Sequence, residues 1–448
     1  MNRYQNLCDL CTGISELYQI DSQYYQGDPV KRGLRNADGT GVVAGVTRIA
    51  NVEGYVMQDG RRVAIPGKLI YRGIDVENIV SAHAQQKTFG YEEVAYLLLF
   101  GKLPTRDQLS LFNDVLSRAR QMPEHFTEDM IMRAPGMDIM NKLARCVLAL
   151  YAYDERANDT SLENMVRQSI ELIARFPIIV ANAYATKRHY SAGESLHIHF
   201  SKEGLSVSEN FLRVLRPNKQ YLPEEAHILD LMMILHAEHG GGNNSAFVCR
   251  AVSSTGTDTY SAIGAAVGSL KGPLHGGANA KVMEMFRDAK SAIANPRDGG
   301  QIRDYLCRVL RREAGDRSGL IYGLGHAVYT VSDPRAVMLK QFARELAGQK
   351  DRVEDFELLA QIEENAVDIV NNTKNRGVAI CANVDMYSGL VYDMLGIPED
   401  LFTPLFAVSR IAGWCAHRIE EVACHKIMRP AYNTASQHQV YIPLEERA

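Results

Sequence analysis

The amino-acid sequence predicts a mainly α-helical protein with a minor β element near the N-terminus. Helical periodicity of apolar residues recurs in almost every stretch after about residue 76. A single alternating, turn-containing segment precedes those stretches and is typical of a β-hairpin. Residues that cap and stop helices punctuate the rest of the chain. A chain of 448 residues is long enough to bury a large core and to form two domains.

The composition is typical of a globular protein from a reducing compartment. Apolar residues make up 46% and charged residues 23% of the chain, and the net charge of -4 favours neither nucleic acid nor a membrane surface as a partner. No apolar run approaches the length of a membrane-spanning helix. The N-terminus lacks the apolar core of a secretory signal, and the 8 scattered cysteines are typical of free thiols. We therefore expect a cytoplasmic protein that binds neither nucleic acid nor membranes.

The predicted elements begin with an amphipathic helix over residues 5–20. Cys8 and Cys11 lie along this helix, and no second CxxC pair completes a metal site with them. Residues 42–75 alternate like short strands, and Asp59-Gly60 supplies the turn of a hairpin. The N-terminal part of the chain thus combines one helix with the only predicted β element.

Helices follow from there to the C-terminal region. One of them covers residues 91–100 and ends at Gly101. Two capping boxes open the next helices, at Thr105 with Gln108 and at Thr160 with Glu163. Helical periodicity predicts further helices over residues 161–188, 222–239, 258–270, 277–290, 300–314, 334–347 and 354–374.

Histidines at two helix ends are the first candidate functional residues. His236 and His239 stand in the last turn of the helix over residues 222–239, which the glycines at 240–242 stop. Two histidines in one turn suit a metal, but HAEH is not HExxH and offers no obvious third ligand. His275 precedes the next helix, whose dipole disfavours a second proton on the ring. A neutral imidazole there can donate a hydrogen bond to a developing oxyanion.

A glycine-rich loop and a small-residue segment hold the next candidates. His326 and Arg335 flank the loop GLGHAVYTVSDPR, which glycines and an Asp-Pro pair interrupt. Asn383 and Asp385 stand in an apolar setting, where a carboxyl group tends to have its pKa raised toward that of a useful base. A plain helix N-cap is the alternative interpretation of Asp385.

Arginines complete the set. Phe406 and Arg410 lie within apolar sequence, where a guanidinium needs an anionic partner, and Arg429 precedes Pro430 near the C-terminus. Guanidinium groups match carboxylates two hydrogen bonds at a time, so the arginines suit a small polycarboxylate. An aspartate with neutral histidine donors suits proton abstraction next to a carbonyl. The residues alone therefore indicate an enzyme that handles a di- or tricarboxylate by enol chemistry.

At this point the sequence resembles the citrate synthase family over nearly its whole length. The motifs that carry the resemblance, in order, are YRGID, YEEVAYLLLFGKLP, HAEHGGGNNSAF, GPLHGGAN, GLGHAVYTVSDPR, NVDMYSG, SRIAGW and the final MRP. The resemblance implies a helical homodimer with a large and a small domain that close over the substrates. It places the small, mobile domain at residues 283–387 and the large domain at residues 1–282 and 388–448.

The resemblance also implies a role for each motif residue. Asp385 would remove a methyl proton from acetyl-CoA, His275 would stabilise the enol, and His326 would protonate the ketone of oxaloacetate. The other motif residues would bind the substrates. His239, Arg335 and Arg410 would hold the oxaloacetate carboxylates, and Arg429 would do so in the site of the partner subunit. Asn243 would line the site, Phe406 would pack near the acetyl group and Asn383 would face the CoA. Acetyl-CoA would be a co-substrate, with no permanently bound cofactor and no metal.

Some positions depart from the family pattern. Thr330 stands where many members have Arg or Lys near a CoA phosphate, and Cys381-Ala382 replaces the more usual Tyr-Pro. Three alternatives stay open. A 2-methylcitrate synthase would use propionyl-CoA with the same residues, because one methylene shifts discrimination by only about 1–3 kcal/mol. The others are a metal-dependent hydrolase using His236 and His239, and a non-catalytic relative.

Overall fold

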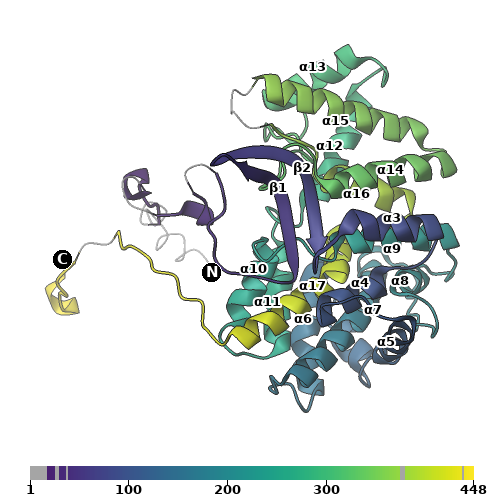
Figure 1. The fold of residues 1–448 in the computed structure, drawn as a ribbon, viewed down its shortest axis with the longest axis vertical. Coiled ribbons are helices and arrows are strands. Elements are labelled where there is room, and N and C mark those ends of the chain that lie inside the picture. Colours follow the sequence, from purple (N-terminus) through teal and green to yellow (C-terminus); the bar gives the residue numbers. More distant parts are fainter. Residues whose placement is uncertain (1–17, 26–29, 37–38, 374–378, 436–437, 448) are drawn as a thin grey trace, which may run out of the picture. The chain divides into compact units, whose positions relative to one another are not determined.

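A computed structural model describes the chain except for residues 1–17, 26–29, 37–38, 374–378, 436–437 and 448 (Figure 1). The predicted helix over residues 5–20 falls almost wholly outside the described residues, as do Cys8 and Cys11. Contacts divide the chain into two compact units, Met1–Ala44 with Met428–Ala448, and Gly45–Ile427. In the first unit, short 3₁₀ helices occupy Ser22–Tyr25, Arg32–Leu34 and Leu444–Glu446.

The predicted hairpin opens the second unit. Strands β1 (Ala50–Gln58), β2 (Arg61–Tyr71) and β3 (Ile74–Asp75) form an antiparallel sheet in the order β1-β2-β3. The predicted turn is confirmed, because Asp59 and Gly60 have φ of 50° and 73° and connect the paired ends of β1 and β2. Positive φ at both central residues is typical of the tight turns that match the twist of a hairpin.

Helices make up most of the second unit, so the prediction of a mainly α fold is confirmed. The helices up to the His275 segment are α3 (Val76–Gln86), α4 (Tyr91–Phe100), α5 (Arg106–Ala119), α6 (Ile139–Leu150), α7 (Leu162–Ala192), α8 (Val207–Leu215), α9 (Pro223–His236), α10 (Asn244–Ser253) and α11 (Thr259–Lys271). Those that follow are α12 (Ala278–Ala292), α13 (Gly299–Leu310), α14 (Pro334–Gln349), α15 (Val353–Thr373), α16 (Asp385–Met394) and α17 (Phe402–Cys424). A short π-helix occupies Thr127–Met132, and single 3₁₀ turns occupy Tyr151–Tyr153 and Glu399–Leu401.

Several predicted helix boundaries are wrong. The helix predicted to end at residue 188 reaches Ala192, and the one predicted to end at residue 314 stops at Leu310. The capping box at Thr160 is not formed, because Ser161 is the N-cap of α7 and makes no side-chain capping bond. The helix predicted to reach His239 ends at His236. The physical reason is Tyr71, whose hydroxyl oxygen lies 3.0 Å from the carbonyl oxygens of Ile234 and Glu238 and thereby holds the chain in a turn.

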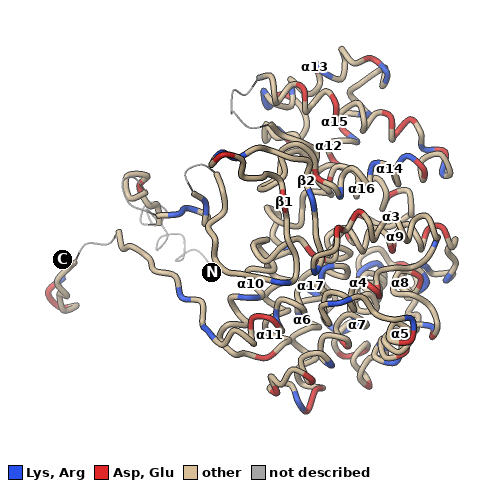
Figure 2. The backbone as a smooth tube through the Cα atoms, in the orientation of Figure 1, with Lys and Arg blue, Asp and Glu red and all other residues tan. Residues whose placement is uncertain are grey.

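Helix α17 is the central element of the second unit. It packs against α4, α7, α9, α10 and α11 and is buried along most of its length (Figure 1). The helices α12 to α16 pack on one another, and positive and negative segments are interspersed along α13, α14 and α15 (Figure 2). No helix among the described residues is long and apolar enough to cross a membrane. The predicted boundaries of a small domain at 283 and 387 fall inside this unit and stay a prediction.

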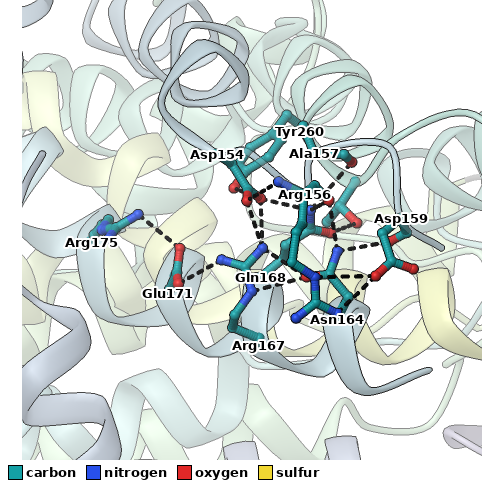
Figure 3. A network of polar contacts seen from close by, with 11 residues as sticks. Asp154, Arg156, Ala157, Asp159, Asn164, Arg167, Gln168, Glu171, Arg175 and Tyr260 are labelled. Atoms are coloured by element: carbon teal, nitrogen blue, oxygen red, sulfur yellow. Dashed lines mark hydrogen bonds and ion pairs between the residues drawn. The ribbon is translucent and has the colours of Figure 1, made fainter. Parts of the chain in front are cut away.

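A partly buried polar network joins the turn after α6 to α7 and α11 (Figure 3). The Asp154 carboxylate accepts hydrogen bonds from Arg167 at 2.7 and 2.8 Å, from Gln168 at 2.9 Å and from the Tyr260 hydroxyl at 2.8 Å. Burial opposes its ionisation, but these donors lower the pKa of Asp154 to about 2. The network therefore fixes three elements through one carboxylate.

Candidate active site

The turn after α9 carries two histidines that lack a full set of partners. His236 is fully buried, its Nδ1 lies 3.4 Å from the Tyr392 hydroxyl, and its ring stacks on Phe406 with centroids 3.9 Å apart. His239 lies beyond the helix end. Within the described part of the chain, the Nε2 atoms of both histidines have no hydrogen-bond partner. Burial and the positive charges of Arg335 and Arg410 lower the pKa of both rings, which are therefore neutral.

His326 comes next to His239 from a distant part of the chain. The two rings meet edge to face with centroids 4.9 Å apart, and His326 stacks on Tyr329 at 4.5 Å. The Nδ1 of His326 accepts hydrogen bonds of 3.1 Å from the backbone N–H groups of Val328 and Tyr329. In a neutral ring the proton must then lie on Nε2, which becomes the donor.

The loop that carries His326 is held from two sides. On one side, the N–H of Gly67 in β2 donates to the carbonyl of Ser332 at 3.0 Å, and a Cβ on Gly67 would come within 2.3 Å of that oxygen. On the other side, the N–H of Gly325 donates to the carbonyl of Cys381 at 2.8 Å. The hairpin therefore positions a histidine that lies more than 250 residues away from it in the sequence.

Arg335 already has a carboxylate partner. Its Nε and Nη2 donate to the two oxygens of Asp333 at 3.0 and 2.6 Å, and both side chains are buried. Such a two-bond pair fixes the plane of the guanidinium. Asp333 thus orients Arg335 at the start of α14.

Arg410 is buried and, among the described residues, forms no ion pair with a carboxylate. Its Nε lies 3.4 Å from the carbonyl oxygen of His236, and its guanidinium lies 4.9 Å from the centre of the Phe406 ring. Burial, followed by the charge of Arg335, lowers the pKa of Arg410 to about 10. The group stays charged at neutral pH, so the site holds a buried cation suited to an anionic ligand.

Asp385 is the first residue of α16 and is half-buried. Burial raises its pKa to about 6, and the nearby Asp333 adds to this rise, while Arg335 and Arg410 oppose it. Asn383 ties the segment to the His326 loop, since its Oδ1 accepts the N–H of Asp385 at 3.0 Å and its Nδ2 donates to the carbonyl of Gly325 at 2.9 Å. Asp385 makes no side-chain capping bond to α16, which disfavours the N-cap interpretation.

His275 lies three residues before α12, as predicted, and contacts the start of α10. Its Nε2 accepts the backbone N–H of Ser245 at 3.2 Å and lies 3.0 Å from the Ser245 hydroxyl. In the neutral ring the proton then lies on Nδ1. Burial, followed by the charge of Arg410, lowers the pKa of His275 to about 4. This low pKa favours a neutral imidazole, although its causes are burial and Arg410 rather than the helix N-terminus on which the expectation rested.

Most of the predicted site residues thus come together around Arg410, whose charge acts on His239, His275 and Asp385. Asn243 serves as the N-cap of α10, accepting the N–H of Ala246 at 3.3 Å. Arg429 belongs to the other compact unit, where its side chain is exposed. Among the described residues, no three His, Cys, Asp or Glu side chains gather as a metal site.

Several residues that hold this cluster in place were not predicted from the sequence. Glu238 and His417 form a fully buried pair, with the His417 Nε2 at 2.9 Å from a carboxylate oxygen of Glu238. Asp333 was interpreted as part of a loop signal, and Tyr71 as a strand residue. The signal for Glu238 was available, because a glutamate between two buried histidines needs a partner.

The fold and the site define a helical protein in which two buried arginines lie near a carboxyl group of raised pKa and neutral histidines. The family model described as "Citrate synthase, C-terminal domain" matches residues 36–431. The chain belongs to the citrate synthase family.

The relatives agree over almost the whole chain. A citrate synthase from Synechocystis sp. is 34% identical, covering 91% of this chain and 92% of the relative. A 2-methylcitrate synthase from Shewanella oneidensis is 33% identical, and the match covers 85% of this chain and 92% of the relative. A ternary complex of carboxymethyl coenzyme A and oxaloacetate with citrate synthase from Thermoplasma acidophilum has a TM-score of 0.76 at 25% identity and covers 94% of this chain and all of the other.

Proposed function

We propose that the protein condenses acetyl-CoA with oxaloacetate and water to give citrate and CoA. The observation that carries this proposal is the placing of Asp385, with its pKa raised to about 6, in the same charged cluster as the neutral His275 and the buried Arg410. A base, an oxyanion donor and an anion-binding cation are what enol formation beside a dicarboxylate requires. The relatives named citrate synthase support the same reaction.

The first step is enol formation. The Asp385 carboxylate removes a proton from the methyl group of acetyl-CoA, and the Nδ1–H of His275 donates to the thioester oxygen, on which negative charge develops. The neutral state of His275 suits this role, because the ring donates a hydrogen bond without surrendering its proton to solvent. Phe406 provides the apolar surface beside the acetyl group.

The second step is carbon–carbon bond formation. The enol carbon attacks the ketone of oxaloacetate, and the Nε2–H of His326 protonates the ketone oxygen as the bond forms. Arg335, Arg410 and His239 hold the two carboxylates, which supply a partner for the unsatisfied Nε2 of His239 and an anion beside the buried charge of Arg410. Water then cleaves the thioester of citryl-CoA, releasing CoA and citrate. The remaining proposed contacts are those of Asn243 with the lining of the site and of Asn383 with CoA.

The proposed assembly is a homodimer in which each site takes Arg429 from the other subunit. Residues 283–387 act as a small domain that closes on the large one when oxaloacetate binds, because Arg335 belongs to the small domain and His239 with Arg410 to the large one. We propose that the reaction uses no metal and no permanently bound cofactor. The six cysteines that the structure describes are free thiols, which supports a cytoplasmic location.

A second candidate is 2-methylcitrate synthesis from propionyl-CoA. The observation that favours it is the similarity to 2-methylcitrate synthases at an identity close to that of the citrate synthases. Because a single methylene separates the two acyl donors, the same set of catalytic residues serves both reactions.

The experiment that tests the proposal measures release of free CoA with oxaloacetate and either acetyl-CoA or propionyl-CoA, in the presence and absence of EDTA. We expect CoA release that needs oxaloacetate, is faster with acetyl-CoA and is unchanged by EDTA. A faster reaction with propionyl-CoA would select the second candidate. Activity abolished by EDTA and restored by a divalent metal would contradict both candidates and favour a metal-dependent hydrolase.

A further inference from the structure

We propose that Trp414 is a positioning residue for His275 and acts through the hydroxyl of Ser245. This inference rests on the proposed function, in which the Nδ1–H of His275 must point toward the acyl group. Trp414 touches neither reacting atom in that scheme. It acts together with the backbone N–H of Ser245 on the hydrogen bonds behind the ring, and so favours the tautomer that carries its proton on Nδ1.

The starting observation is a stripe of residues on α17. Arg410, Gly413, Trp414 and His417 recur at helical spacing and face the site together. Arg410 lies against the carbonyl of His236, and His417 bonds to Glu238 at 2.9 Å. Trp414 is the member of this stripe that contacts Ser245 and so reaches the surroundings of His275.

The connection consists of two short polar contacts. The indole Nε1–H of Trp414 donates to the Ser245 Oγ at 3.2 Å, and that oxygen lies 3.0 Å from the Nε2 of His275. Trp414 and Ser245 are fully buried, so water does not replace either contact. The indole nitrogen is only a donor, which fixes the direction of the first bond.

That direction decides the role of the serine hydroxyl. Because Ser245 Oγ already accepts the indole hydrogen, its own hydrogen is left for Nε2 of His275 or for the Oδ1 of Asn243, which lies 3.0 Å away. The backbone N–H of Ser245 also points at Nε2. A proton on Nε2 would face these donors, so the ring keeps its proton on Nδ1.

Loss of the indole N–H weakens this bias, and the backbone N–H of Ser245 is then the remaining donor that opposes a proton on Nε2. Ser245 Oγ would then lack a donor, and a ring with its proton on Nε2 would supply one. In that tautomer Nδ1 carries no hydrogen and offers nothing to the thioester oxygen. The binding of oxaloacetate does not depend on this ring, so the effect belongs to the chemical step.

The kinetic test uses Trp414→Phe, which keeps a buried aromatic ring and removes the N–H. We expect kcat to fall about tenfold while the KM for oxaloacetate changes by less than about twofold. Ile411→Ala is the matched control, since Ile411 is a buried apolar residue of the same helix. The control should lose stability without the same loss of kcat. An unchanged kcat in Trp414→Phe, or equal losses in both variants, would overturn the proposal.

A second measurement needs no activity and no change at Trp414. Trp414 is the single tryptophan of the chain, so indole-labelled protein gives one indole ¹H–¹⁵N resonance. We expect this resonance to shift in Ser245→Ala and in His275→Gln and to stay in place in Ile411→Ala. An indole chemical shift that is unchanged in both Ser245→Ala and His275→Gln would overturn the proposal. Wild-type protein that releases no CoA would instead contradict the proposed function while leaving the indole result interpretable.

Discussion

The carboxyl group of Asp385 has opposing neighbours, and its ionisation gives the first prediction. Burial and Asp333 raise its pKa to about 6, while Arg335 and Arg410 oppose the rise. Only the ionised group acts as a base, so kcat/KM should be full above pH 6 and fall as the pH drops through that value. Asp385→Asn should lower kcat by about a thousandfold at pH 7 and leave oxaloacetate binding nearly unchanged. Steady-state kinetics and calorimetric titration with oxaloacetate measure the two effects.

Asp393→Asn is the control for this prediction, because Asp393 lies on the same helix and is an exposed ion-pair partner of Arg352. It should keep wild-type turnover. Citrate formation at the wild-type rate in Asp385→Asn would show that another group removes the proton. If the residual kcat/KM of Asp385→Asn still falls as the pH drops through 6, the pH dependence belongs to another residue.

The sequence predicted the neutral state of His275 from its place before a helix, which is a local property. It did not predict that Asp333 binds Arg335, although the two residues are adjacent to one proline. The pattern around Asp-Pro indicates only a helix start, and the direction of a side chain beyond the cap depends on the tertiary fold. The ionic environment of Asp385 was hidden for the same reason.

At the scale of elements, the hairpin supports the His326 loop. A Cβ on Gly67 would lie 2.3 Å from the carbonyl oxygen of Ser332 and 2.4 Å from the ring of Tyr329, which stacks on His326. Gly67→Ala should therefore displace the loop and lower kcat at least tenfold, with a smaller loss of stability. Gly348→Ala in α14 is the control, because nothing lies within 4 Å of the added carbon. Equal kinetics in the two variants would contradict the supporting role of β2.

The Asp154 network makes a prediction about acid stability. The pKa of Asp154 in the folded protein is about 2, below the ordinary value of 3.8. The ionised carboxylate therefore stabilises the folded state above pH 4, and this stabilisation is lost as the pH falls toward 2. At pH 7, Asp154→Asn should lower the free energy of unfolding by about 2–3 kcal/mol, because Arg167 and Tyr260 lose an ionised acceptor. Urea unfolding at pH 7 and pH 3 should show the difference between variant and wild type shrinking with acid. A difference that stays constant would mean that the charge of Asp154 contributes nothing.

Elements with local signals were predicted well, and elements fixed by distant residues were not. The capping box at Thr105 and the turn at Asp59-Gly60 depend on neighbours in the sequence, and both are confirmed. The end of α9 depends on Tyr71, which lies more than 160 residues earlier, so periodicity alone carried the helix too far. The Asp154 network was missed because its three elements meet only in the folded chain.

At the scale of the whole molecule, the proposed sharing of Arg429 between subunits has a sharp test. His275→Ala and Arg429→Ala homodimers should each be nearly inactive. Co-refolding them should give about half mixed dimers, in which one site carries both lesions and the other carries none, so activity should recover to about a quarter of wild type. Mixed dimers confirmed by mass but without activity would mean that Arg429 serves the site of its own chain.

The unsatisfied polar atoms of the candidate site have a consequence outside catalysis. In the part of the chain that the structure describes, His236 and His239 each bury a ring nitrogen that has no partner, and Arg410 is a buried cation that forms no ion pair. Such groups weaken the folded state, and a ligand that satisfies them stabilises it by mass action. The concentration of oxaloacetate would then govern how often the chain opens to proteases. A cell rich in this metabolite would keep the protein longer, so substrate supply would regulate abundance as well as flux.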